Sequence, residues 1–194
     1  EGMLFYVMPF VEGESLRARL TSERALSVPM TVSILRDVAR ALAFAHERGI
    51  VHRDIKPDNV LLAGGAAIVA DFGVAKAVAT ARDRKEHPHG TLTSAGISLG
   101  TPAYMAPEQV ASDPTMDHRA DLYALGVMAY EMLAGRPPFA DRGVRETMQA
   151  HLVETPEPLT RYRPTTPAAL ASLVMQCLEK DPAHRPQDAA AILA

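Results

Sequence analysis

Residues 52–62 read HRDIKPDNVLL and place a cluster of charged and polar side chains directly before an apolar run. Apolar residues enclose this cluster on both sides, because Ile50 and Val51 precede it and Val60 to Leu62 follow it. Loops between secondary-structure elements are often charged, but they also carry many of the functional residues of a domain. The stretch is therefore either an ordinary charged turn or a site, and the remaining sequence discriminates between the two.

Length and composition describe one compact unit. The chain has 194 residues, is 47% hydrophobic and has a formal net charge of −3, which suits a single core and gives no general basic field for nucleic acid. Its only cysteine, Cys177, excludes an internal disulfide and fits a reducing compartment. The apolar run 60–70 is too short for the roughly 20 residues of a membrane span. We expect a cytoplasmic domain, with any membrane anchor lying elsewhere in a longer protein.

Hydrophobic spacing predicts a mainly helical domain with a small β element. Apolar residues recur at three and four positions in the helical segments, whereas the strand segments are short and bounded by turn residues. Residues 74–100 read as one long loop, and loops of this length are usually functional or disordered. The predicted helices are a short one after Gly13, then 29 to a stop at Gly49, 121–133, 144–152 and 167–178, and the predicted strands are 2–8, 50–51, 60–62 and 68–70.

A second polar motif follows the strand predicted at 68–70. Residues 71–73 read DFG, so the carboxylates of Asp54 and Asp71 and the amide of Asn59 can reach one cleft from neighbouring strand ends. Oxygen ligands of this kind suit Mg²⁺, which is usually held by one or two carboxylates together with substrate phosphates. Lys56 adds a cation that can stabilise a phosphate during transfer. The pattern indicates phosphoryl-transfer chemistry.

Five motifs in this order resemble one family. The chain is similar to bacterial serine/threonine protein kinases of the eukaryotic-like type, and the resemblance runs from Met3 to the end. It implies an α+β, protein-kinase-like fold: the hinge and the mainly helical C-terminal lobe with short β hairpins, over residues 1–194, without the small lobe or the end of the last helix. The motifs are HRDIKPDN at 52–59, DFG at 71–73, GTPAYMAPE at 100–108, DLYALG at 121–126 and HRP at 184–186.

The resemblance implies roles for the polar residues of these motifs. Asp54 would be the base that orients the substrate hydroxyl, and Lys56, which marks serine/threonine kinases, would neutralise the γ-phosphate of ATP. Asn59 and Asp71 would hold Mg²⁺ or Mn²⁺. Thr101 would form a hydrogen bond near Asp54 and Lys56. The GTPAYMAPE segment would build a shelf on which a protein substrate docks, and we call residues 100–108 the peptide shelf.

ATP contacts are implied at the beginning of the chain. Met8 falls at the gatekeeper position and Pro9 to Val11 at the hinge, so the Val11 backbone would meet the adenine edge. Leu61 would form the floor beneath the adenine ring, and Ser15 would lie in the same ATP site.

Regulation is implied at Arg53 and in the following loop. Arg53 would give a phosphate on the activation loop a cationic partner, and dimerisation would serve autophosphorylation. Thr93 is the favoured acceptor. The other candidates are Thr91, Ser94 and Ser98.

The remaining family positions are structural. Glu108 and Arg185 match an ion pair that ties the activation segment to the lower helices. Asp121 matches a carboxylate that holds the catalytic-loop backbone, although a plain helix N-cap is an equal interpretation of that residue. The set is completed by an apolar column at His52 and Phe72 and by the turn glycine, Gly73.

Two family features are absent from this sequence. It contains no G-x-G-x-x-G loop and no V-A-I-K-like strand, which cover and hold the ATP phosphates in protein kinases. We expect the chain to be part of a longer kinase in signalling and to be inactive on its own. The alternative is a non-catalytic, pseudokinase-like scaffold. Small-molecule phosphotransferases share an H-x-D-x-x-x-x-N loop, but the GTPAYMAPE segment argues against them.

Overall fold

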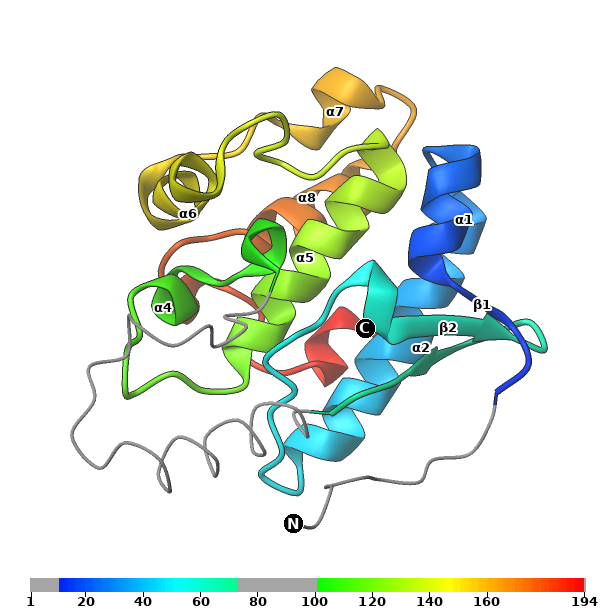
Figure 1. The fold of residues 1–194 in the computed structure, drawn as a ribbon, viewed down its shortest axis with the longest axis horizontal. Coiled ribbons are helices and arrows are strands. Elements are labelled where there is room, and N and C mark those ends of the chain that lie inside the picture. The colour runs from blue at the N-terminus through cyan, green and yellow to red at the C-terminus, as the bar shows by residue number, and fades with distance from the viewer. Residues whose placement is uncertain (1–10, 73–100, 194) are drawn as a thin grey trace, which may run out of the picture.

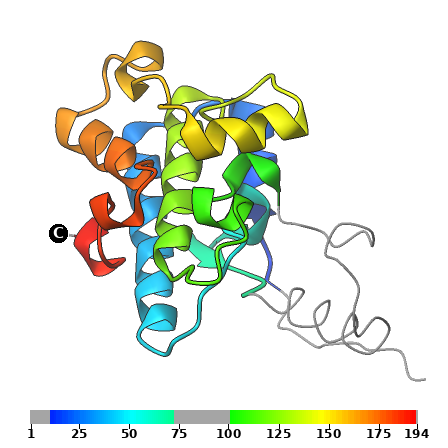
Figure 2. The same ribbon diagram turned by 90° about the vertical axis from the view of Figure 1, so that its left-hand side faces the viewer.

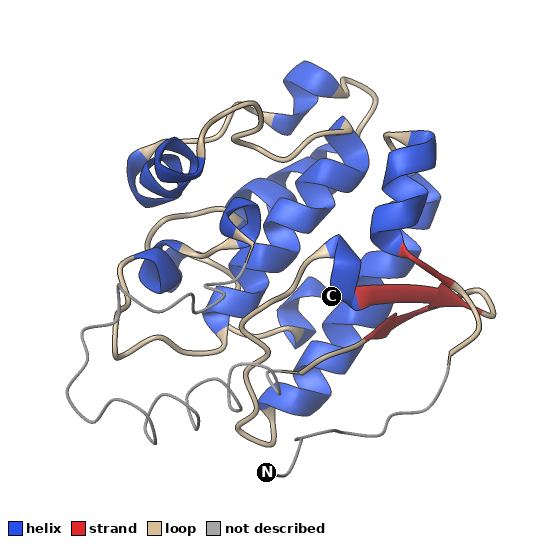
Figure 3. Cartoon of the chain, viewed as in Figure 1, coloured by secondary structure: helices blue, strands red, loops and turns tan. Residues whose placement is uncertain are grey.

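The computed structural model describes residues 11–72 and 101–193. Helices form most of this part, and a small antiparallel sheet lies on one side of them (Figures 1 and 3). The predicted α+β, mainly helical architecture is confirmed. No helix within the described ranges has both the length and the apolarity needed to cross a membrane.

The first long helix is α2, Val28–His46. Ser27 caps it, with its side chain accepting a hydrogen bond from the Met30 amide, and a proline lies in the first turn, an arrangement that favours helix initiation. Its apolar face, which includes Val38 and Leu42, is fully buried. The helix ends at His46, three residues before the predicted stop.

The strand predicted at 50–51 is wrong. Neither residue lies in a strand, and the Ile50 amide instead donates a hydrogen bond of 3.0 Å to the Ala45 carbonyl, which closes the end of α2. Gly49, with φ at +71°, makes the reversal that this bond requires. The backbone donor that a strand would have used is therefore occupied.

Helix α5, Arg119–Ala134, is the centre of the molecule. Nearly all of its residues are buried, as expected for a helix that is covered on all sides. It contacts α2, α4 (Pro107–Val110), α7 (Leu159–Tyr162) and α8 (Ala168–Cys177), as the side view in Figure 2 also shows for α2.

The contact between α5 and α8 is unusually close. A Cβ added at Gly126 would lie 2.6 Å from the Cβ of Cys177, a separation that side chains do not tolerate. Cys177 is 3% exposed, so the single thiol lies inside the helical core. The glycine of the DLYALG motif is thus needed for helix packing.

The other helical elements lie around this centre. Helix α1 begins directly after Ser15, whose hydroxyl accepts from the Ala18 amide at 3.1 Å. Helix α8 begins one residue later than predicted, because Pro167 is its N-cap. The bounds are α1 Leu16–Glu23 and α6 Val144–Val153, with the 3-10 turns η1 Pro57–Asn59, η2 Pro102–Tyr104, η3 Pro182–His184 and η4 Ala190–Ile192.

The sheet has the order β1-β2-β3 and positions the site. Strand β1, Glu14–Ser15, pairs with β2, Val60–Ala63, and β2 pairs with β3, Ala66–Val69, all antiparallel. The predicted strands 60–62 and 68–70 are thereby confirmed within two residues, whereas β1 was not predicted. Because Val60 is opposite Val69, the residues before β2 and after β3 meet at one edge.

Candidate active site

Two side chains of the 52–59 loop converge on the carboxylate of a third residue, Asp54. Lys56 Nζ lies 2.8 Å from Asp54 Oδ2, and Asn59 Nδ2 donates to both the Asp54 carbonyl oxygen at 2.8 Å and Asp54 Oδ2 at 3.1 Å. The loop can reach this arrangement because Pro57 begins the short turn η1, which folds Asn59 back toward Asp54. The Asp54 side chain is 35% exposed, so it stays accessible from solvent.

Thr101 does not join this group. Within the described residues no hydrogen bond links its hydroxyl to Asp54 or Lys56, and its carbonyl instead accepts from the Tyr104 amide at 3.0 Å to close η2. The expected hydrogen bond of Thr101 near Asp54 and Lys56 is thus not present among the described residues.

The end of β3 brings Asp71 to the same edge. The Ala70 amide donates to the Asn59 carbonyl at 2.8 Å, and His52 Nε2 is 2.9 Å from the Ala70 carbonyl oxygen. On the other side of Asp71, the Phe72 ring lies 4.7 Å from the His52 ring, centroid to centroid. Asp71 is therefore held between two residues that contact the loop, and its own side chain is exposed.

One buried carboxylate holds the loop backbone. Asp121, 1% exposed, accepts hydrogen bonds from the amides of His52 at 2.8 Å and Arg53 at 2.7 Å, and His46 Nε2 lies 2.9 Å away. The N-cap of α5 is His118, so the interpretation of Asp121 as a plain helix cap is wrong.

This anchoring coincides with backbone strain. Arg53 has φ at +67° and Asp71 has φ at +58°, in the left-handed region that costs a residue with a side chain free energy. The Arg53 amide is fixed by Asp121, and the Arg53 carbonyl accepts from Gln109 Nε2 at 2.8 Å. Both sides of the strained residue are thus restrained, while its guanidinium remains exposed.

The chemistry of the donors fits a magnesium ion. Both Asn59 side-chain hydrogen bonds are donated by Nδ2, and among the described residues its Oδ1 accepts none. Asn59 Oδ1 and the exposed Asp71 carboxylate are hard oxygen donors of the kind Mg²⁺ prefers. No cluster of three or more His, Cys, Asp or Glu side chains suited to a metal exists in the described ranges, so phosphate oxygens and water would complete the coordination.

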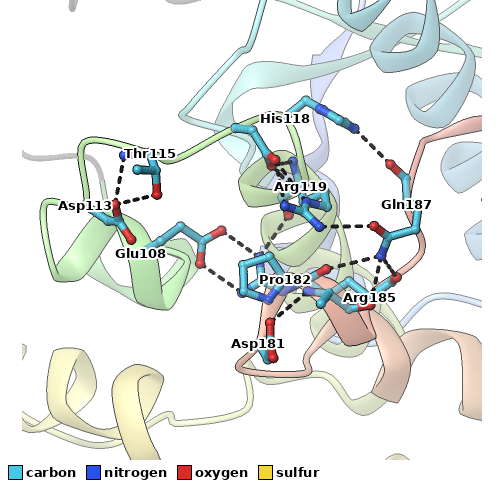
Figure 4. A network of polar contacts seen from close by, with 11 residues as sticks. Glu108, Asp113, Thr115, His118, Arg119, Asp181, Pro182, Arg185 and Gln187 are labelled. Carbon is cyan, nitrogen blue, oxygen red and sulfur yellow. Dashed lines mark hydrogen bonds and ion pairs between the residues drawn. The ribbon is translucent and has the colours of Figure 1, made fainter.

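A second charged contact involves Glu108, the last residue of the peptide shelf (Figure 4). Arg185 donates to both carboxylate oxygens of Glu108, at 2.6 and 2.8 Å. Its other hydrogen bonds reach the carbonyl oxygens of Glu179, Lys180 and Arg119 at 2.7 to 3.0 Å. The Arg185 side chain is 0% exposed, and its guanidinium donors are directed inward to the protein.

The chain is similar to known proteins. A family model described as the protein kinase domain matches residues 1–194.

This chain belongs to the protein kinase domain family.

It is 43% identical over 186 residues to the serine/threonine-protein kinase Pkn1 of Myxococcus xanthus, which covers 93% of this chain and 25% of that protein. It is 42% identical over 191 residues to PkaB of Streptomyces coelicolor, covering 94% of this chain and 42% of PkaB. It is 34% identical over 191 residues to PknB of Mycobacterium tuberculosis, covering 98% of this chain and 29% of PknB. The kinase domain thus spans less than half the length of each of these curated relatives.

The residues expected to contact ATP are partly visible in this kinase domain. Ser15 and Leu61 are direct partners across β1 and β2, so these two expected positions lie side by side, and Val11 lies three residues before β1. The Ser15 hydroxyl already caps α1. Met8, Gly73 and Thr93, together with Thr91, Ser94 and Ser98, lie outside the described residues.

The kinase domain also contains a polar cluster that sequence reasoning missed. Arg17 Nη1 donates to Glu131 Oε1 at 2.7 Å, and the Tyr104 hydroxyl forms hydrogen bonds with both Arg17 and Glu131. Burial, then the Glu131 carboxylate, raises the pKa of Tyr104. Arg17 Nε also lies 3.4 Å from Asp58 Oδ2, which gives Asp58 a structural partner. Arg17 and Glu131 lie in no recognisable motif, so no sequence signal indicated that they join Tyr104 and Asp58.

Proposed function

We propose that this kinase domain transfers the γ-phosphate of ATP to serine and threonine hydroxyls of proteins. The observation that carries the proposal is the convergence of Asp54, Lys56 and Asn59 within 2.8 to 3.1 Å, beside the exposed carboxylate of Asp71. Three curated relatives are named serine/threonine-protein kinases. This arrangement supports the proposal, because Asp54 would be the proton acceptor, Lys56 the cation, and Asn59 and Asp71 the metal donors.

In the proposed reaction Asp54 acts on the acceptor hydroxyl. The hydroxyl oxygen forms a bond to the γ-phosphorus while the bond from that phosphorus to the bridging oxygen breaks, and ADP leaves. Asp54 accepts the hydroxyl proton. Lys56, already paired with Asp54, offers its remaining N–H groups to the γ-phosphate oxygens. The Asn59 hydrogen bond to the Asp54 carboxylate fixes its orientation, which lowers the entropic part of the barrier.

Asn59 and Asp71 would hold Mg²⁺ in this site, with Mn²⁺ as a substitute. A bound ion would neutralise part of the charge on the phosphate oxygens. The contribution of the chain is to fix both donors relative to Asp54. It does so through the Ala70–Asn59 backbone bond and the His52–Ala70 contact.

We further propose that these residues act as the large lobe of a longer kinase. Val11, Ser15 and Leu61 would line the ATP side of the site, and a small lobe would supply the glycine-rich loop and the lysine that this sequence lacks. The 194-residue chain alone is then expected to transfer little or no phosphate. A phosphorylated activation loop, with Thr93 as first candidate, would pair with the exposed Arg53.

The decisive experiment compares two polypeptides. The longer natural protein that contains these residues, and the 194-residue chain, are each assayed with labelled ATP, Mg²⁺ and a generic protein substrate such as myelin basic protein. We expect transfer to serine and threonine by the longer protein only. A longer protein that binds ATP or partner proteins but transfers nothing would favour the scaffold alternative and overturn the kinase proposal.

The phosphorylation site is tested separately by mass spectrometry. After incubation of the longer protein with ATP, we expect phosphate within residues 91–98, and a dependence of its rate on protein concentration if two copies modify each other. Phosphate found only outside this range would overturn the activation-loop assignment.

A further inference from the structure

Three polar side chains outside the candidate active site are linked in a row inside the helical core. Lys180 Nζ lies 3.2 Å from the Tyr123 hydroxyl, and that hydroxyl lies 2.8 Å from His151 Nδ1. His151 Nε2 lies 3.1 Å from the carbonyl oxygen of Ala103. The row connects α5 and α6 to η2, which belongs to the peptide shelf.

The direction of each hydrogen bond follows from the groups at the two ends. A carbonyl oxygen only accepts, so His151 Nε2 must carry a proton and donate to Ala103. A neutral imidazole then presents Nδ1 as an acceptor, which requires the Tyr123 hydroxyl to donate to it. The Tyr123 oxygen is left with lone pairs that accept from the Lys180 ammonium, which only donates. We call this directed row of Lys180, Tyr123, His151 and the Ala103 carbonyl the shelf relay.

The surroundings keep the shelf relay in this protonation state. His151 is 0% exposed, and the ring of Phe139 contacts it edge-on at 5.0 Å. Burial and then the Lys180 charge lower the pKa of His151 to about 4, so the imidazole is neutral at physiological pH. Burial also lowers the pKa of Lys180 to about 8, which still leaves the amine mainly protonated near pH 7.

The shelf relay ends at η2, in the peptide shelf. η2 is a single 3-10 turn of three residues, and such short turns rely on contacts outside themselves. Tyr104, the last residue of η2, forms hydrogen bonds with Arg17 and Glu131 on one side. The Ala103 carbonyl is held on the other side by His151. Without His151, the Ala103 carbonyl loses its hydrogen bond to a side chain.

We propose that the shelf relay positions the Ala103 carbonyl and thereby sets how tightly the peptide shelf binds a protein substrate. Lys180, Tyr123 and His151 are positioning residues: none of them contacts Asp54, Lys56 or Asn59, and they act through Ala103. This inference rests on the proposed kinase function, because it assigns the shelf its substrate.

The test removes one hydroxyl at each of two tyrosines of the same helix. Tyr123→Phe breaks two links of the shelf relay, whereas Tyr130→Phe, two turns further along α5, removes only a hydrogen bond of 3.1 Å to the Glu157 carbonyl. In the longer kinase we expect Tyr123→Phe to raise the KM for a peptide substrate by about three- to tenfold. The KM for ATP and kcat should stay within about twofold. Tyr130→Phe should change none of these.

Lys180→Met provides a graded second variant. It removes the first link together with a hydrogen bond of 3.4 Å from Nζ to the Ala150 carbonyl. It keeps a chain of similar length over the Phe139 ring, which lies 4.9 Å from Nζ. We expect a smaller rise in peptide KM than with Tyr123→Phe. Peptide KM values unchanged in both variants, or parallel losses in kcat and in both KM values, would overturn the inference.

A spectroscopic arm separates the shelf relay from the kinase function. In the isotopically labelled 194-residue chain, the His151 nitrogen shifts should show a protonated Nε2 and an accepting Nδ1. The Ala103 carbonyl carbon should shift in Tyr123→Phe and Lys180→Met but not in Tyr130→Phe. If the longer protein transferred no phosphate the proposed function would fail, and an unmoved Ala103 carbonyl would still refute the shelf relay by itself.

Discussion

Two of the ion pairs in the described part of the molecule differ in how exposed they are and in how many further hydrogen bonds they make. Asp54 and Lys56 form a pair whose side chains are 35% and 18% exposed, and the carboxylate and ammonium each keep capacity for further partners. Glu108 and Arg185 form a pair that is 8% and 0% exposed, with the guanidinium directed to one carboxylate and three carbonyl oxygens. The first pair can therefore take further hydrogen-bond partners, whereas the second holds segments of the chain together.

The two pairs differ in how their surroundings satisfy the hydrogen bonding of the charged groups. Around Arg185, three backbone carbonyls from two segments of the chain complete the hydrogen bonding, which offsets part of the cost of removing charge from water. Around Asp54, the backbone of the loop is held by Asp121 instead, so the Asp54 carboxylate is positioned and still has room for further hydrogen-bond partners. Asp121 holds the loop backbone, and a different carboxylate, that of Asp54, is the one proposed to take part in the reaction.

The largest effect is expected from Asp54→Asn in the longer kinase. The amide cannot accept the hydroxyl proton, so kcat should fall by about two to four orders of magnitude, with little change in ATP binding. Steady-state kinetics and nucleotide titration measure the two quantities. Asp58→Asn, four residues along the same loop, is the matched control, because the exposed contact of Asp58 to Arg17 is worth little. Equal losses of kcat in Asp54→Asn and Asp58→Asn would contradict the assignment of Asp54 as the base.

The next largest effect is on stability, at Arg185→Met. Its loss leaves the buried Glu108 carboxylate without compensation, which costs about 3–5 kcal/mol in the free energy of unfolding. Chemical denaturation of the 194-residue chain measures it. The double variant Arg185→Met with Glu108→Gln should recover part of the loss, because the orphaned charge is gone. A double variant as unstable as the sum of both single changes would contradict this explanation.

An intermediate effect is expected from pH, through a buried group that stays uncharged. The folded pKa of His151 is about 4, below the ordinary 6.5, so between these values the unfolded chain binds a proton that the folded chain does not. Stability from this group is complete above pH 6.5 and is lost as pH falls toward 4, by roughly 3 kcal/mol. Unfolding midpoints measured across this range should fall less steeply in His151→Gln than in the unmodified chain.

The smallest effect is expected at an exposed pair, Arg142 and Glu154. Their contact of 2.8 Å has side chains 36% and 45% exposed, so solvent and salt screen it. Arg142→Gln should leave the thermal midpoint within the scatter of replicate melts at physiological salt. A clear fall in the thermal midpoint would show that exposure does not distinguish ion pairs that stabilise the fold from ion pairs that contribute little.

Motif-bearing residues were more predictable than those without a motif. The sequence placed Asp54, Asn59 and Asp71 together because the antiparallel hairpin that follows Asn59 is short, and the observed Val60–Val69 register gives that edge. The strand at 50–51 was wrong because apolar character alone does not reveal that the Ile50 amide closes α2. The shelf relay was out of reach: Tyr123, His151 and Lys180 are far apart in sequence, and only packing brings them together.

Because Gly126 and Cys177 are in close contact, the rate at which the single thiol is labelled reports how often the core opens. Burial raises the pKa of Cys177 to about 12, and no room exists between α5 and α8 for an attached reagent. Labelling by a thiol reagent must therefore wait until the two helices separate. The rate of labelling of this sulfur gives the frequency with which the two helices separate. The same rate, measured with and without nucleotide or peptide, would show how much ligand binding stabilises the core against this opening.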